Sequence, residues 1–197
     1  VDLVYLHHCN FGKNGEYFDE ALDVLTNFKK QGGLRFIGLS DWSNSRIMKY
    51  IKMCDPDVVQ PYRNVMDDGF IKSGLCSYLN KNNLGVCFFS PIKHGLLTGK
   101  YDKPISFELG DHRSGVKDFA DQNVIDKMKQ NKLLLEKRFA KHKYPVMRGL
   151  VDALFNDAKS GCVLLGQRNV DQVNVASTLG EPMDEKDSVW VKSLYHH

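Results

Sequence analysis

Residues 21–43, ALDVLTNFKKQGGLRFIGLSDWS, hold a helix, a glycine turn and a strand in direct succession. Apolar residues recur at helical spacing over 16–30, which predicts a helix with one apolar stripe. Gly32 and Gly33 are typical of the end of such a helix. The run at 34–40 is apolar almost throughout, as in strands of a parallel sheet that are buried on both faces. This succession predicts an α/β fold.

The same succession recurs along the chain. Five apolar, β-prone runs are predicted as strands, at 1–7, 34–40, 57–60, 85–90 and 161–166. Further helices are predicted after the N-cap Ser43, over the apolar residues of 70–79, and at 122–141, 146–156 and 184–194. The sequence shows little of the alternation and few of the short hairpins that indicate antiparallel strands, so we expect a parallel sheet covered by helices.

The length of 197 residues predicts one domain, at roughly 150 residues per domain. Hydrophobic residues make up 42% and charged residues 26%, which argues against a disordered chain. The chain has no run of about 18 apolar residues, so no membrane span is expected. Asp2 and His7 interrupt the first apolar run, so no signal peptide is expected either. His196 and His197 resemble the start of an affinity tag and are set aside.

Charge and cysteine content exclude further classes. The 27 basic and 24 acidic residues give a net charge of +3, which is too balanced to indicate nucleic-acid binding. The cysteines are odd in number, widely spaced and without a C-x-x-C pair: Cys9, Cys54, Cys76, Cys87 and Cys162. This pattern argues against a disulfide framework or a metal site, and it predicts a reducing, cytoplasmic setting.

The region at about 95–121 interrupts the strand–helix order with several glycines, a proline and mixed charges. Long ordered loops in compact domains often act as lids over a site. A floppy insertion fits the same composition, and the sequence leaves the two readings open.

Ligands of parallel α/β folds bind beyond the carboxyl ends of the strands. His7 ends the first strand, where it could polarise a substrate or simply bond to backbone. Trp42 and Tyr62 are more typical of core packing. Arg168 and the N-cap Asn169 follow the last strand and predict an anion site, because a helix N-terminus offers N–H groups and arginine adds a bidentate donor.

A second phosphate candidate is the glycine-rich segment from Ser90 to Lys100, although neither the P-loop pattern nor the G-x-G-x-x-G pattern of dinucleotide-binding folds is present.

Taken together, several segments of the sequence are more specific than any one of them. They are VDLVYLHH, ALDVLTNFKKQGGLRFIGLSDWS, DVVQ, NNLGVCFFSPIKHGLLTGKY, GDHRS, CVLLGQRNVDQV and EPMDEKD. Their order along essentially the whole chain resembles the aldo-keto reductase family, in its bacterial and potassium-channel-β-like branches.

The resemblance implies a (β/α)8 barrel of the TIM type that binds NADPH in extended form, and it implies site residues. His7 would be the catalytic histidine that orients the substrate carbonyl. Residues contacting the nicotinamide would be Ser40, Asp41 and Gln60, with Phe89 stacking on the ring. Residues along the pyrophosphate would be Ser90, Ile92, Gly95 and Lys100. Residues at the adenosine end, with its 2′-phosphate, would be Gly166, Arg168 and Gln172.

Three positions depart from the pattern of the resembled family. Asp41 stands where the family usually has asparagine, and a carboxylate cannot donate to the carboxamide oxygen. Arg63 replaces an expected tyrosine, and Ala176 replaces an asparagine that usually reaches adenine. Each departure implies weaker cofactor binding.

The resemblance begins at the histidine strand, and the family's catalytic Asp, Tyr and Lys lie in the three βα units before it. We therefore expect residues 1–195 to form a single incomplete barrel domain of about five units, with a loop insertion at about 95–121, since a full barrel takes about 250 residues. Asp2, Tyr5 and Lys13 are not substitutes, because nothing places them correctly.

Three functional hypotheses follow. The first is an oxidoreductase that uses NADPH to reduce a small aldehyde or ketone to an alcohol. The second is a non-catalytic NADPH-binding or regulatory protein. The third is a barrel fragment that associates with itself through unpaired strand edges. No nucleic-acid or membrane partner is expected for any of them.

Overall fold

A computed structural model describes residues 1–158 and 160–196, which form two compact units. The first unit holds residues 1–63, 67–89, 158 and 160–164, and the second holds 64–66, 90–157 and 165–196. His197, the second histidine of the predicted tag remnant, lies outside the described residues.

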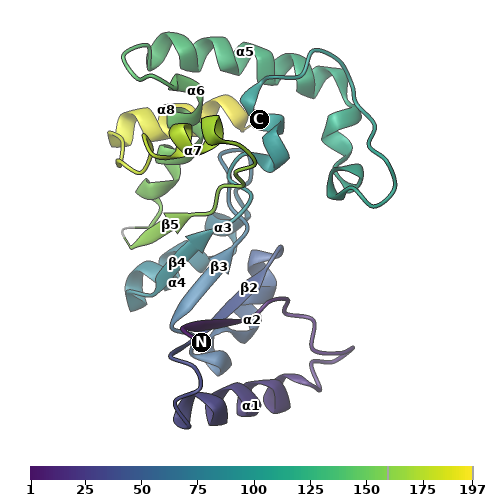
Figure 1. Cartoon of the computed structure of the whole chain (residues 1–197), viewed down its shortest axis with the longest axis vertical. Coiled ribbons are helices and arrows are strands. Elements are labelled where there is room, and N and C mark those ends of the chain that lie inside the picture. Colours follow the sequence, from purple (N-terminus) through teal and green to yellow (C-terminus); the bar gives the residue numbers. More distant parts are fainter. Residues whose placement is uncertain (159, 197) are drawn as a thin grey trace. The chain divides into compact units, whose positions relative to one another are not determined.

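The first unit is built on a five-stranded sheet whose strands are all parallel (Figure 1). The strands follow chain order: β1 (Leu3–Leu6), β2 (Phe36–Asp41), β3 (Val58–Pro61), β4 (Gly85–Phe88) and β5 (Gly161–Val163). Each of the five predicted runs contains one of them. The prediction of a parallel sheet is confirmed, and β1 and β5 form its two edges within the described chain.

Four helices accompany this sheet: α1 (Phe18–Lys30), α2 (Asn44–Cys54), α3 (Gly69–Lys72) and α4 (Leu75–Asn82). Ser43 caps α2 as predicted, because its hydroxyl accepts a hydrogen bond from the Arg46 N–H at 3.4 Å. The prediction of one continuous helix over 70–79 is wrong. Gly74 adopts a φ of 79°, a left-handed conformation that interrupts the helix between α3 and α4.

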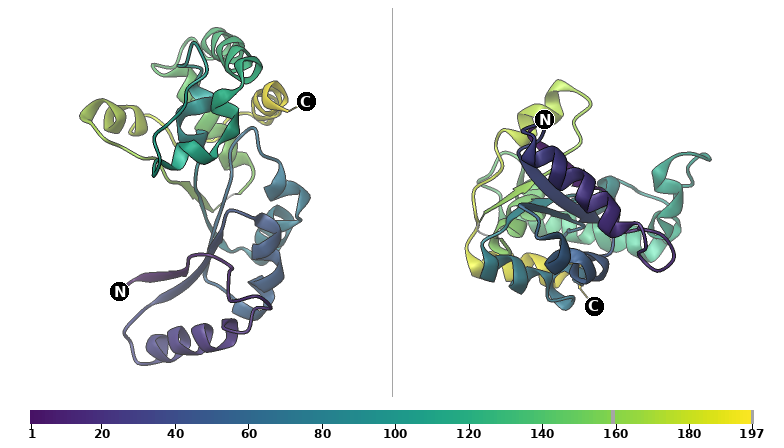
Figure 2. Two further views of the ribbon diagram at one scale, coloured as in Figure 1. Left: turned by 90° about the vertical axis from the view of Figure 1, so that its right-hand side faces the viewer. Right: turned by 90° about the horizontal axis from the view of Figure 1, so that it is seen from below.

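The core of the first unit lies between the sheet and its helices. Figure 2 shows α2 and α4 along one face of the sheet, and Leu39, Ile47 and Val59 are fully buried there. On β1, the Tyr5 ring lies over Gly38 so closely that a Cβ atom at Gly38 would come within 2.3 Å of the ring. Only glycine fits at that position without a shift of Tyr5.

An ion pair fixes the end of α1 in this unit. The Lys29 ammonium lies 2.7 Å from the Asp57 carboxylate, which also accepts a hydrogen bond from the Ile37 N–H at 2.8 Å. Burial alone would raise the pKa of Asp57, but these two donors hold it below its usual value. Asp57 therefore joins α1, β2 and β3 while it is ionised.

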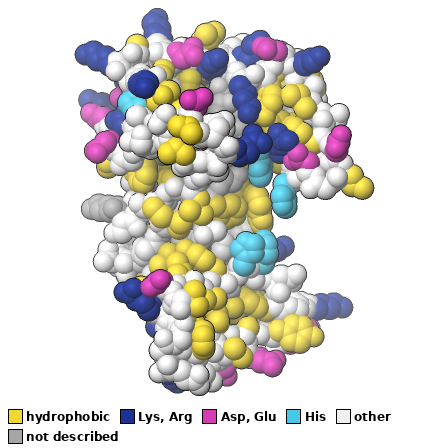
Figure 3. All heavy atoms as spheres, in the orientation of Figure 1, with side chains coloured by type: hydrophobic (Ala, Val, Ile, Leu, Met, Phe, Trp, Pro, Cys, Tyr) yellow, Lys and Arg dark blue, Asp and Glu magenta, His cyan; other side chains and the backbone are white. Residues whose placement is uncertain are grey.

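An apolar groove of about 460 Å³ lies between β1 and α1. Its lining is mainly apolar: Val4, Tyr5, Leu6, Tyr17, Ala21, Val24 and Leu25, with Glu20 beside them. Tyr17 and Val24 are more than half exposed, and Figure 3 shows hydrophobic side chains gathered over this part of the molecule. The groove flanks the edge of β1 that has no neighbouring strand in the described residues.

The second unit is helical. Its main elements are α5 (Gln122–Arg138), α6 (Pro145–Met147), α7 (Val170–Ala176) and α8 (Glu185–Tyr195). The predicted helix at 146–156 is correctly placed, with Pro145 at its start, but it is not regular. After α6 the chain makes a π-helical turn at Arg148–Asp152 and a 3-10 turn at Ala153–Asn156. Within the described residues, no helix is both long and apolar enough to cross a lipid bilayer.

The region predicted as a loop at about 95–121 contains short 3-10 helices at Lys93–Thr98, His112–Gly115 and Lys117–Ala120. Phe119 is almost fully buried there, with its ring 5.4 Å from that of Tyr101 and 4.9 Å from that of Phe107. This packing favours an ordered segment over a floppy insertion. A role for the segment as a lid stays a prediction.

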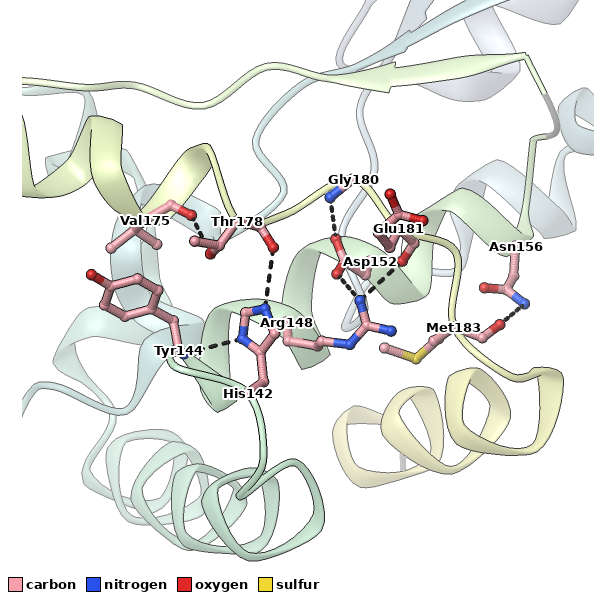
Figure 4. A network of polar contacts seen from close by, with 10 residues as sticks. All are labelled: His142, Tyr144, Arg148, Asp152, Asn156, Val175, Thr178, Gly180, Glu181 and Met183. Carbon is pink, nitrogen blue, oxygen red and sulfur yellow. Dashed lines mark hydrogen bonds and ion pairs between the residues drawn. The ribbon is translucent and has the colours of Figure 1, made fainter.

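A polar network joins the turn after α6 to the segment between α7 and α8 (Figure 4). The Asp152 carboxylate is fully buried and accepts hydrogen bonds from Arg148 at 2.6 Å and from the Gly180 N–H at 2.9 Å. Arg148 also donates to the Glu181 carbonyl at 3.1 Å. Asp152 is therefore the centre of the contacts that hold the α7–α8 segment in place.

Candidate functional site

In the first unit, the predicted site residues lie at the carboxyl ends of neighbouring strands. Leu6 pairs with Leu39, so His7 comes level with Ser40, which in turn pairs with Gln60. The Ser40 hydroxyl donates to the Gln60 carbonyl at 2.9 Å. Phe89 follows β4 and bridges to Tyr62 beyond the end of β3. This is the edge at which parallel α/β folds bind ligands.

His7 is exposed, and its ring lies 4.3 Å from that of His8. Its ring makes no hydrogen bond to any residue that the structure describes. The expectation that a strand-end histidine is held by backbone therefore does not apply here, and both ring nitrogens are open to a ligand.

Asp41 is fully buried, and both of its carboxylate oxygens have partners in the chain. One accepts the Cys9 N–H at 2.9 Å and the other the Ser43 N–H at 2.6 Å, and Arg46 lies 3.8 Å away. Asp41 thus ties the end of β2 to the segment after β1 and to the start of α2. Its predicted contact with a nicotinamide would have to share these oxygens.

Three aromatic rings form a cluster at the same edge of the sheet. The Trp42 ring centroid lies 5.2 Å from that of Tyr62 and 4.9 Å from that of Phe89, and the latter two are 5.6 Å apart. Trp42 is 48% exposed, so its assignment to the core is wrong. Trp42 directly follows the strand-end residues Ser40 and Asp41, a position that favours the ligand-binding edge of the sheet over the core.

In the second unit, the candidate pyrophosphate segment has a strained backbone. Ser90, Lys93 and His94 have φ values of 59°, 47° and 55°, which are uncommon for residues other than glycine, and Gly95 follows at 90°. Such strain is often found at ligand sites. The Ile92 carbonyl accepts the Gly95 N–H at 2.9 Å and closes the turn.

Two further features of this segment bear on ligand binding. The Ser90 hydroxyl is shielded from solvent and has no hydrogen-bond partner within residues 1–158 and 160–196. A Cβ atom at Gly95 would lie 3.2 Å from the Lys100 ammonium, so the lysine stands directly over the glycine. An unsatisfied buried hydroxyl and a cation over a glycine turn suit an oxygen-rich anionic ligand.

The adenosine-end residues of the second unit surround the start of α7. Asn169 caps the helix as predicted, accepting the Gln172 N–H at 3.0 Å, and the Gln172 side chain accepts the Arg168 N–H at 2.6 Å. Two of the N–H groups expected to meet an anion are therefore already bonded. The exposed Arg168 guanidinium has no ion pair with any described residue, and it remains the principal donor beside the exposed Gly166.

Arg63 is fully buried and donates to the Asp67 carbonyl, so it supports the fold, while Ala176 closes α7 half-buried. Burial raises the pKa of the Tyr5 phenol, with the nearby Cys87 and Cys162 adding to the rise. No group of three or more metal-binding side chains is placed to hold an ion in the described part of the chain.

Comparison with known proteins identifies the fold first. The chain is similar to the solved structure of the glycerol dehydrogenase AKR11B4 from Gluconobacter oxydans, at 23% identity, with a TM-score of 0.79 over 98% of this chain and 58% of that one. This likeness confirms an α/β fold of the (β/α)8 barrel type, in which about five of the eight βα units are present.

The family follows from the sequence comparison. The model of the Aldo/keto reductase family matches residues 1–187, so the chain belongs to that family. Among curated relatives, L-glyceraldehyde 3-phosphate reductase of Escherichia coli (strain K12) is 27% identical over 88% of this chain. The chain spans about half, 51%, of that relative's length.

Two further relatives carry a cofactor in their names. The aldo-keto reductase yakc [NADP(+)] of Schizosaccharomyces pombe is 27% identical over 62% of this chain and 36% of its own length. The NADH-specific methylglyoxal reductase of Escherichia coli (strain K12) is also 27% identical, over 56% of this chain and 34% of its own length.

Proposed function

We propose that this chain holds the cofactor-contacting part of an oxidoreductase that reduces a small aldehyde or ketone with NADPH. The observation that carries the proposal is the row of polar and aromatic residues at one edge of the parallel sheet. His7, Ser40 and Gln60 follow one another across neighbouring strands there, with Phe89 beyond them. Membership of the Aldo/keto reductase family supports this reaction class.

The second unit offers groups that would suit the phosphates of a dinucleotide. The Ser90 hydroxyl lacks a partner among the described residues, and Lys100 stands over Gly95, which together suit a pyrophosphate. The Arg168 guanidinium would hold the 2′-phosphate that distinguishes NADPH from NADH. The bound cofactor would supply the hydride. The names of the relatives include both cofactors, so the preference rests on Arg168.

The chain's own residues would bind and orient the reactants. A protonated nitrogen of His7 would donate a hydrogen bond to the substrate carbonyl oxygen and fix its direction. Phe89, packed edge-on against Trp42 and Tyr62, would offer its ring to the nicotinamide. Ser40 and Gln60 would contact the carboxamide from adjacent strands.

The test compares both cofactors on the same protein by fluorescence titration. We expect Arg168→Ala to weaken NADPH binding by about tenfold or more, as a charge-assisted contact to phosphate is lost, and to leave NADH binding unchanged. Arg35→Ala, which removes an exposed arginine of the first unit, is the matched control. An equal loss for both cofactors would exclude the 2′-phosphate role.

A second candidate function is NADPH binding without turnover, as in a regulatory protein. The observation that favours it is the position of Tyr5, whose ring packs against Gly38 within the β1–β2 pair, where burial also raises its pKa, so Tyr5 is poorly placed to donate a proton. Reduction of 4-nitrobenzaldehyde, followed by loss of NADPH absorbance, distinguishes the two. Turnover excludes the regulatory candidate, and binding without turnover excludes catalysis by this chain.

A further inference from the structure

Two cysteines face each other across the last pair of strands. Cys87 of β4 is the direct register partner of Cys162 of β5, and the Cys162 thiol donates a hydrogen bond to the Cys87 sulfur at 3.2 Å. Cys87 is buried and Cys162 is exposed. Both belong to the first unit, and neither takes part in the proposed reductase chemistry.

The backbone geometry permits a bond between them. Neighbouring strands lie about 4.8 Å apart, and the Cα atoms of a disulfide are usually about 4.4–6.8 Å apart. Closing the sulfurs from 3.2 Å to about 2.05 Å requires a shift of about 1 Å. β5 is three residues long and lies at the edge of the sheet, so it can move by that amount without disturbing the central strands.

The two thiols differ in a way that suits stepwise oxidation. Burial raises the pKa of Cys87 to about 12, so its thiol is protonated near neutral pH and is not the sulfur that reacts first with an oxidant. Cys162 is open to solvent and is therefore the sulfur that an oxidant reaches first. Cys87 then lies within contact distance to resolve the oxidised sulfur.

The other cysteines lack this arrangement. Burial also raises the pKa values of Cys9 and Cys54, to about 12 and about 11, and neither is accessible to solvent. Cys76 is partly exposed, and the Asn80 amide donates a hydrogen bond to its sulfur at 3.5 Å. A two-thiol reaction is therefore expected at Cys87 and Cys162, whose sulfurs are in contact and one of which is exposed.

We propose that Cys87 and Cys162 form a reversible dithiol–disulfide couple that responds to peroxide. The Cys162 thiolate attacks one oxygen of hydrogen peroxide, the O–O bond breaks, and hydroxide leaves, which gives a sulfenic acid. The Cys87 thiol then attacks the Cys162 sulfur, an S–S bond forms, the S–O bond breaks, and the hydroxyl group leaves as water with the Cys87 proton. The hydroxide from the first step takes up the proton that Cys162 released. The two thiols lose two electrons in total, and one peroxide becomes two waters.

The disulfide fastens the edge strand β5 to β4, across 75 residues of sequence. β5 leads directly into the segment that carries Gly166 and Arg168. Oxidation would therefore place a covalent bond, the Cys87–Cys162 disulfide, just before the start of that segment. A thiol reductant would break this disulfide again by thiol–disulfide exchange. This inference does not depend on the proposed reductase function.

The experiment treats the protein with hydrogen peroxide and counts free thiols. We expect two of the five to be lost together, and dithiothreitol to restore them. A tryptic digest run without reductant should contain peptide 82–93 linked to peptide 160–168, two hydrogens lighter than the sum of the two. The rate should not depend on protein concentration, because both sulfurs belong to one chain.

Three single variants make the result specific. Cys87→Ser and Cys162→Ser should each abolish the linked peptide, while Cys76→Ser should leave its yield unchanged. In the unmodified protein, phenylarsine oxide, which needs two adjacent thiols, should block the same two cysteines. The proposal is overturned if Cys162 is oxidised to sulfinic acid without linkage, if the cross-links form between chains, or if the linked peptide contains another cysteine.

Discussion

Asp152 offers the sharpest test of the packing in the second unit, because one buried carboxylate joins the turn after α6 to the segment between α7 and α8. Replacement by alanine removes the acceptor of Arg148, at 2.6 Å, and of the Gly180 N–H, at 2.9 Å. The Arg148 side chain is only 22% exposed, so water reaches it poorly. Both donors would be left with incomplete hydrogen bonding.

The expected destabilisation follows from these stranded donors. Burial raises the pKa of Asp152, although the Gly180 N–H and Arg148 oppose the rise, so ionisation of the carboxyl group is less favourable here than in water. The loss therefore comes mainly from the unpaired partners. A stranded, partly buried guanidinium and one amide together amount to about 2–3 kcal/mol of unfolding free energy.

Urea unfolding followed by circular dichroism measures the effect. The matched control is Asp187→Ala, which removes a partly exposed carboxylate from Arg138, 2.6 Å away, and should change stability by less than about 1 kcal/mol. The double variant Arg148→Met/Asp152→Leu removes both charges and should be more stable than Asp152→Ala. If Asp152→Ala unfolds at the same urea concentration as Asp187→Ala, the reasoning is wrong.

Three further predictions concern the first unit. Because the pKa of Asp57 is lower in the folded protein than its unfolded value of about 3.9, the ionised carboxylate stabilises the fold above that pH. The difference in unfolding free energy between the wild type and Asp57→Asn should therefore shrink as the pH falls below about 4. A difference that stays constant with pH in unfolding experiments would exclude the ion pair. Gly38→Ala should lower the free energy of unfolding in urea by about 1–3 kcal/mol, because the new Cβ atom meets the Tyr5 ring. The double variant Gly38→Ala/Tyr5→Leu should recover part of that loss. Equal losses in the single and the double variant would refute the clash. Light scattering at tens of micromolar protein should show self-association of the wild type. Val24→Glu, in the groove between β1 and α1, should abolish this association, and Leu133→Glu on α5 should not. A monodisperse wild-type monomer would contradict the prediction.

The strands and their order could be predicted because the relevant signals are local. A continuous apolar run between turn residues is visible in the sequence, and all five runs form parallel strands. The break at Gly74 was missed because an isolated glycine inside an amphipathic pattern does not reveal its φ. The π-helical turn at Arg148–Asp152 was missed because its residues keep helical spacing.

The placement of the candidate residues at one edge of the sheet could be predicted, but their contacts could not. Strand ends locate His7, Ser40 and Gln60, but one partner of the Asp41 carboxylate, the Cys9 N–H, is 32 residues away in the sequence. Burial of an aromatic residue likewise depends on tertiary neighbours, which is why Trp42 was assigned to the core. The pairing of Cys87 with Cys162 follows from strand register, which no single segment encodes.

The sequential order of the five strands also bears on how the sheet assembles. The paired residues Ser40 and Gln60 are 20 residues apart, whereas Cys87 and Cys162 are 75 apart. Closing the longer connection adds about 1 kcal/mol of chain entropy, and β5 has only three residues with which to offset it. We therefore expect β5 to join last during folding and to open first in the native protein. Hydrogen exchange should detect this as faster exchange of the β5 amides than of those in β2 and β3, and equal protection across the sheet would contradict it.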